Sequence, residues 1–156
     1  GYKHNQCLTC FAKAHRSGFA YYNDDITDEH FPKPSRILKP GDKLWVRAFQ
    51  QTVRGTTTSE ERLAYLVAQK AILVGAQGLT LVYQQKRDQL PKGIWYASFD
   101  EKDRLWQDAV GSHRVPYLNA LSYGVFDFDL GSFGSVWHQD SAFLCFCDLP
   151  ELPSET

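Results

Sequence analysis

The sequence has no methionine, only four cysteines among 156 residues, and no surplus of basic side chains. Its formal net charge is −1, so no overall electrostatic attraction to nucleic acid or to an anionic membrane is expected. The chain contains no apolar run of the roughly eighteen residues that a transmembrane helix needs. It also lacks a basic N-terminus followed by an apolar stretch, so no signal peptide is visible. These absences predict a protein with no membrane span.

The signature motifs of common enzymes are missing as well. There is no Ser-His-Asp order, no glycine-rich phosphate-binding loop and no His-Glu-x-x-His segment. The acidic residues between positions 23 and 29 lack the spacing of a calcium-binding loop and indicate a solvated loop. We therefore predict that the chain is not an enzyme and holds neither a metal nor a cofactor.

The four cysteines form two close pairs, Cys7-x-x-Cys10 and Cys145-x-Cys147. Two such pairs at opposite ends of the chain could form a four-thiolate zinc site. Cys145 and Cys147, however, lie in an apolar run, and free cysteine is among the residue types most often buried. We predict four reduced, metal-free thiols, with zinc as the alternative and disulfides as the least favoured state.

Aromatic side chains are abundant: they make up 14% of the chain, with ten Phe, eight Tyr and four Trp. A chain of 156 residues suits a single domain that buries about two-thirds of its unfolded surface. We predict one domain over 1–156, with an irregular or helical segment over 1–30. Two prolines after position 148 predict a tail over 148–156 that leaves the sheet.

Periodicity predicts about eight short strands and one good helix. Apolar alternation indicates strands at 44–49, 79–83 and 126–130, with a turn at 75–78, and the runs 93–99 and 142–147 are further strand candidates. A capping box, Thr58-x-x-Glu61, indicates a helix over 59–69, and residues 7–15 suit one or two helical turns. This pattern is typical of an all-β sandwich or barrel with a minor helix. Shared strand parity predicts one common core, formed by Leu44, Val46, Leu79, Leu81, Phe126, Phe128, Leu144 and Phe146.

The order of segments from Leu79 to Cys147 resembles the second half of a picorna-like virus capsid protein. The matching features are a tyrosine-rich strand with a proline-closed turn, a Val-Pro-Tyr segment followed by Ser, an aromatic-Asp element, a Phe-Gly pair and an Asp at the last strand. In this chain the same five features are found, in the same order, at residues 79–91, at Val115-Pro116-Tyr117 with Ser122, at residues 126–130, at Phe133-Gly134 and at Asp140. The resemblance implies a two-sheet jelly-roll sandwich.

The same resemblance implies a structural coat subunit that assembles with copies or sister chains into an icosahedral shell around RNA. Its partners would be other capsid subunits and viral RNA on the inner face, and it would be found in the virion and, during assembly, in the host cytoplasm. Gly1 would be the residue left by a viral protease, with tag removal as the alternative origin. Aromatic residues in expected loops and edges predict a permanent interface of about 2,000 Å² or more. The candidate interface residues are Phe31, Trp106, Tyr117, Tyr123, Phe133 and Trp137, with Tyr2 beside them.

Two other functions compete with this interpretation. The segment from Pro40 to Val46 resembles the strand after a Pro-Gly-Asp turn in PUA-like barrels, where Trp45 or Trp95 would stack on a base. The segment from Cys7 to Ala12 resembles the nucleophile segment of papain-like peptidases, with Cys10 as thiolate and His138 as base.

Asp127 and Asp129 alternate with phenylalanine, so both carboxylates should face the same side of one strand. A paired-carboxylate hydrolase could use that arrangement, and His113 or His138 could pair with the two acids. A solvated strand face is the commoner explanation, and it is the one we predict.

Overall fold

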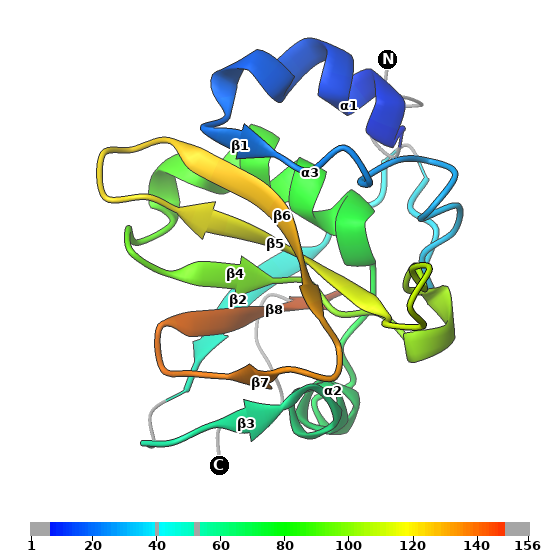
Figure 1. Ribbon diagram of the computed structural model, residues 1–156, viewed down its shortest axis with the longest axis vertical. Helices are drawn as coiled ribbons and strands as arrows, with labels where there is room; N and C mark the ends of the chain where they lie inside the picture. The colour runs from blue at the N-terminus through cyan, green and yellow to red at the C-terminus, as the bar shows by residue number, and fades with distance from the viewer. Residues whose placement is uncertain (1–6, 40, 52–53, 149–156) are drawn as a thin grey trace.

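A computed structural model describes residues 7–39, 41–51 and 54–148 of the chain. The described residues form eight short strands and three α-helices, and four of the strands follow one another at the C-terminal end (Figure 1). The helices are α1 (Leu8–His15), α2 (Ser59–Ala68) and α3 (Gly75–Lys86), with 3₁₀ turns at Arg16–Gly18, Arg87–Gln89 and Lys102–Arg104. The strands are β1 (Tyr21–Tyr22), β2 (Trp45–Gln50), β3 (Thr57–Thr58), β4 (Trp95–Ala97), β5 (Arg114–Ala120), β6 (Phe126–Ser132), β7 (Val136–Trp137) and β8 (Ser141–Cys147). The predicted β-rich fold is therefore confirmed in its coarse form, as are the helices expected within 7–15 and 59–69, and α3 is an additional helix.

Six strands form one mixed sheet in the order β1-β6-β5-β4-β8-β2, and β3 pairs with β7 in a second, two-stranded sheet. β1 runs parallel to β6 and β4 parallel to β8, while the other neighbours are antiparallel. The large sheet is open, because β1 and β2 form its two edges. The described strands thus do not close into the barrel that a PUA-like domain would need.

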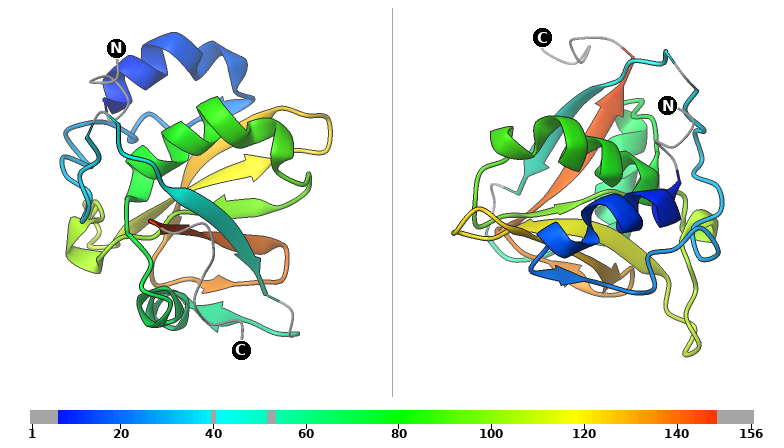
Figure 2. Two further views of the ribbon diagram at one scale, coloured as in Figure 1. Left: turned by 180° about the vertical axis from the view of Figure 1, so that it is seen from behind. Right: turned by 90° about the horizontal axis from the view of Figure 1, so that it is seen from above.

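One face of the large sheet, called here the inner face, packs against α3 and α1 (Figure 2). Tyr96, Leu118 and Phe128 are almost fully buried in this layer. Phe11 of α1 packs edge-on against the rings of Tyr83 and Phe128. The predicted common core is confirmed, because all eight of its residues are buried or partly buried in one cluster.

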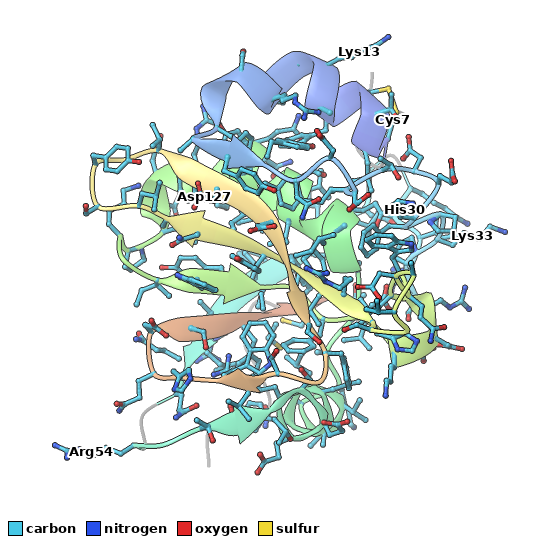
Figure 3. The ribbon with its side chains drawn as sticks, viewed as in Figure 1. Cys7, Lys13, His30, Lys33, Arg54 and Asp127 are labelled. Carbon is cyan, nitrogen blue, oxygen red and sulfur yellow. A yellow bond between two sulfur atoms is a disulfide. The ribbon has the colours of Figure 1, made fainter. Side chains whose placement is uncertain are left out.

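The opposite, outer face is covered only in part. Over β8 and β2 it is covered by α2 and the small sheet, where Phe143 contacts the rings of Tyr65 and Phe49. Over β5 and β6 it carries Asp127 and Asp129, which are half-buried. The predicted wet face of β6 is confirmed, and Figure 3 shows Asp127 on the side of the sheet opposite α3.

The N-terminus of α2 is fixed by the capping box that the sequence predicts. The Thr58 hydroxyl accepts a hydrogen bond from the Glu61 amide at 3.1 Å, and the Glu61 carboxylate accepts one from the Thr58 amide at 2.8 Å. Two amides that the helix itself cannot satisfy are thus satisfied locally. This is why α2 begins at the residue that local sequence indicates.

The predicted strand at 79–83 and the predicted turn at 75–78 are wrong, because both lie in α3. Residues 75–83 are buried almost throughout, so apolar side chains occur on all sides of the helix and mask its period. The alternation of Leu79, Leu81 and Tyr83 then imitates a strand. Close packing explains the glycine at position 78: a Cβ there would clash with the Val74 side chain and lie 3.0 Å from the ring of Phe146 on β8.

The prediction of four reduced cysteines is wrong for the first pair. Cys7 and Cys10 form a disulfide, whereas Cys145 and Cys147 are free thiols in β8 and buried. Cys7 is the N-cap of α1, so Cys10 lies one turn along the same side of the helix, within bonding reach. Burial raises the pKa of Cys145 to about 11, so this thiol is protonated at neutral pH.

Parts of the predicted terminal segments lie outside the described residues: 1–6 of the segment 1–30, which includes Tyr2, and 149–156 of the tail 148–156. Among the described residues, no helix combines the length and apolar character needed to cross a membrane.

Candidate functional site

An apolar groove of about 660 Å³ lies on the inner face, between α3 and β2. Its floor is formed by Leu144 and Phe146 of β8. One wall is α3, through Leu81 and its neighbours, and the other is β2. The groove is lined by Leu38, Gly41, Asp42, Lys43, Leu44, Trp45, Val46, Ala48, Gly78, Leu81, Val82, Gln85, Lys86, Gln89, Leu90, Pro91, Leu144 and Phe146. Its volume is within the range of ordinary ligand sites, about 300–1,000 Å³.

The groove exists because the inner layer is incomplete at this end of the sheet. α3 covers the central strands and leaves β2 beside it, largely uncovered (Figure 2, left). Leu44, Val46 and Leu81 are only half-buried, and Ala48 is exposed, whereas the inner residues of β5 and β6 are buried. The apolar side chains that line the groove therefore remain open to solvent.

The strand β2 is also the last strand of the sheet. It pairs with β8 from Trp45 to Gln50, and no other strand of the described ranges lies on its outer side. An edge strand of this length is a template for an added strand. Trp45, at its start, leaves 51% of its surface exposed. The groove thus has a strand-pairing edge along one wall.

Charges at the rim are mostly positive. Lys43 and Lys86 line the groove, opposed by the carboxylate of Asp42. That carboxylate accepts a hydrogen bond from the Lys39 amide at 2.8 Å and so closes the turn before β2. Because two lysines stand against one carboxylate, the rim favours a ligand with an acidic or carboxylate flank.

The structure describes all six predicted interface residues, and four of them are buried within the chain. Phe31, Tyr117, Phe133 and Trp137 are each less than a tenth exposed. Trp137 and Phe133 pack against the ring of Phe99. The prediction placed these side chains at expected loops and edges, but the chain uses them in its own core.

The other two do not form a common patch with these four. Trp106 is half-buried and stacks on His30, with ring centroids 4.0 Å apart. Tyr123 is 71% exposed at the turn between β5 and β6. Of the whole predicted set, Tyr123 is the described residue that offers a large surface to a partner.

Both tryptophans that would stack on a base, Trp45 and Trp95, are exposed, and Trp95 has acidic side chains around it. Trp95 stacks on Tyr117 with ring centroids 4.7 Å apart, and the Tyr117 hydroxyl donates to Asp129 at 3.2 Å. Asp127 accepts from the Asn119 side chain on the same face. Carboxylates beside Trp95 would repel a phosphate backbone, so a base-stacking role for this residue has no electrostatic support.

The structure does not bring together the residues of the peptidase alternative or of the zinc-site alternative. Cys10 lies on α1, at one end of the molecule, and His138 follows β7 at the other end (Figure 1). Among the described residues, no group of three or more His, Cys, Asp or Glu side chains could hold a metal ion. The two cysteine pairs therefore do not meet in a zinc site within the described part of the chain.

Sequence reasoning missed the groove because it depends on the identity of α3. The predicted strand at 79–83 occupies the place of α3, so the sequence predicts no helix that could form the second wall of the groove. The signal present in the sequence is the alternation at 44–49, which predicts that Leu44, Val46 and Ala48 share one face of a strand, and all three line the groove. Comparison of the chain with protein families, curated proteins and solved structures finds no match.

Proposed function

We propose that this protein is a binding module that takes an extended, apolar segment of a partner protein into the groove as an added strand on β2. The observation that carries the proposal is that an edge strand forms one wall of an open apolar groove. In this mode of recognition, main-chain hydrogen bonds to the edge strand supply affinity and pockets for alternate side chains supply specificity.

The dimensions of the two walls suit such a ligand. The six residues of β2 span about 20 Å, so a peptide of similar length pairs along the whole strand. Every second side chain of that peptide would lie on the inner face, next to Val46 and Ala48 at the open side of the groove. Burying one large apolar side chain contributes about 1.5–3 kcal/mol, so three contribute at most about 9 kcal/mol. Association itself costs about 4 kcal/mol or more, so a micromolar affinity, near −8 kcal/mol, requires the main-chain hydrogen bonds to β2 as well.

Val46→Lys is expected to weaken binding of a designed peptide at least about tenfold, because a charged side chain would replace an apolar wall of the groove. The probe is an eight-residue peptide that alternates valine with serine and ends in two glutamates, titrated by calorimetry. Val67→Lys is the matched control, since Val67 is exposed on α2 and does not line the groove.

A second peptide separates strand addition from simple apolar binding. It has the same side chains but carries N-methyl groups on the amides that would face β2, so it cannot pair with the strand. Strand addition predicts that this peptide binds much more weakly than its parent. Equal affinity for both peptides, or no binding of either, would refute the proposal.

The jelly-roll coat subunit is a second proposal. Its structural support is that the small sheet β3–β7 stacks on the outer face of the large sheet, where Trp137 approaches Gly131 of β6. The aromatic surplus that suggested a shell is weaker support, because four of the six described candidates are buried in the chain itself.

The coat-subunit proposal predicts assemblies larger than a dimer at micromolar concentration, with Tyr123 at the contacts. Sedimentation velocity of the wild-type chain and of Tyr123→Ser measures this directly. A monomer that stays monomeric across the concentration range, with or without sister chains, would exclude the coat-subunit role.

A further inference from the structure

We propose that the Cys7–Cys10 pair is a thiol–disulfide exchange site that passes two electrons between this chain and a disulfide or dithiol of a partner protein. The inference is independent of the groove, which lies on β2 and α3. It begins from the position of the disulfide at the N-terminus of α1, at the periphery of the molecule (Figure 3).

A stabilising role alone does not explain this bridge well. It joins residues only three apart, and in the loop-entropy description a disulfide that closes a short loop stabilises least. The α1 helix is already tied to the core by Leu8 and Phe11, which are buried. Both sulfur-bearing residues are only half-buried, so an external thiol can approach them.

Two features of the helix favour a thiolate at Cys7, and the neighbouring carboxylate of Asp28 opposes it. The Cys7 sulfur accepts a hydrogen bond from the Cys10 amide at 3.0 Å, and it sits at the positive end of α1. Amide donors and a helix N-terminus both stabilise a negatively charged sulfur. This assigns Cys7 as the sulfur that attacks a partner, and Cys10 as the one that resolves the mixed disulfide.

The carboxylate of Asp28 lies beside the Cys7 sulfur. One carboxylate oxygen of Asp28 lies 3.7 Å from the Cys7 sulfur, and the carboxylate accepts hydrogen bonds from the backbone amides of Leu8 and Thr9 at 2.8 and 3.1 Å. In the reduced chain the Cys7 thiol can donate a hydrogen bond to this carboxylate. Because the carboxylate also opposes a negative charge on the sulfur, Asp28 is a positioning residue that sets the pH at which Cys7 reacts.

The exchange balances in two steps. The Cys7 thiolate attacks one sulfur of the partner disulfide, whose other sulfur leaves as a thiolate and takes up a proton. Cys10, on losing its proton, then attacks the Cys7 sulfur, reforms the Cys7–Cys10 bond and releases the partner's second thiol. The chain's dithiol is oxidised and the partner disulfide is reduced to two thiols, and the reverse reaction uses a partner dithiol as reductant.

The test uses reduced full-length chain and the small aromatic disulfide 5,5′-dithiobis(2-nitrobenzoate). Cys10→Ser, which keeps Cys7, is expected to form a mixed disulfide at least about threefold faster than Cys7→Ser, because the larger thiolate fraction is partly offset by lower nucleophilicity. The double variant gives the background from the buried thiols. Wild-type chain should release two equivalents of aromatic thiol and recover its internal disulfide.

Asp28→Asn separates an exchange site from a merely structural bridge. It is expected to move the midpoint of the pH–rate profile of Cys10→Ser to lower pH, while the far-ultraviolet spectrum confirms that α1 is intact. Equal slow reaction of the two single variants, or a wild-type disulfide that dithiothreitol cannot reduce without unfolding the chain, would overturn the proposal. An unchanged pH profile would remove Asp28 from it.

Discussion

Replacing Arg62 by alanine is expected to lower the free energy of unfolding by about 4 kcal/mol, the largest effect of any single change considered for this chain. Arg62 lies in α2 and is only 2% exposed. Its guanidinium packs over the rings of Phe143 and Trp137, with its carbon 5.1 and 5.5 Å from the ring centroids. The alanine variant would therefore leave a cavity between two aromatic rings.

The polar contacts of Arg62 add to this cost. Its Nε donates to the Thr57 hydroxyl at 2.8 Å, and one Nη donates to the carbonyl oxygens of His138 and Ser141 at 3.3 and 3.4 Å. These bonds join α2 to β3, to the turn before β8 and to the first residue of β8. Burial lowers the pKa of Arg62 to about 10, so the side chain is still charged at neutral pH.

Urea unfolding followed by circular dichroism measures the effect. Arg62→Met is expected to cost about half as much, since it keeps the packing of the stem and loses the donors. Arg54→Ala is the control, because Arg54 is exposed in the loop before β3 and points away from the molecule (Figure 3). A loss below about 1 kcal/mol for Arg62→Ala would show that water replaces the guanidinium at little cost.

The second large effect concerns Asp100, whose contribution should make the chain more stable as the pH falls from 7 to 4. Asp100 is 2% exposed, and burial raises the pKa of its carboxyl from 3.8 to about 6. Hydrogen bonds from the Ser35 side chain and amide and from the Glu101 amide oppose that rise only in part. The folded chain therefore binds a proton more tightly at Asp100 than the unfolded chain does.

The sign of the pH dependence follows from this difference. Below about pH 4 the carboxyl is protonated in both states, and the folded state carries no penalty from it. As the pH rises from about 4 to about 6, the unfolded chain ionises first, so stability falls, and above that window it is constant. The separation of the two pKa values corresponds to about 3 kcal/mol.

Asp100→Asn should remove this dependence. When the pH is lowered from 7 to 4, the unfolding free energy of wild type should rise by about 3 kcal/mol relative to that of the variant. Asp103→Asn is the control, since Asp103 is exposed in the neighbouring 3₁₀ turn. A difference that does not vary across this window would place the pKa of Asp100 near its ordinary value.

Features that rest on short-range patterns could be predicted from the sequence. Period-two alternation placed β2 and β6, because neighbouring side chains on a strand alternate between faces whatever the rest of the chain does, and a continuous apolar run placed β8. The pair Thr58 and Glu61 placed the start of α2, because a capping box is complete within four residues. The shared core of these strands followed from the same parity.

What only the tertiary structure decided depends on contacts between residues far apart in the chain. α3 is a helix because its buried sides meet β5, β8 and α1 at once, and such surroundings erase the local pattern that would identify it. The aromatic residues beyond β5 became core because Phe99 and Arg62 reach them from distant segments. The groove depends on the gap between α3 and β2, and burial and edge exposure are properties of the assembled sheet, not of any short segment.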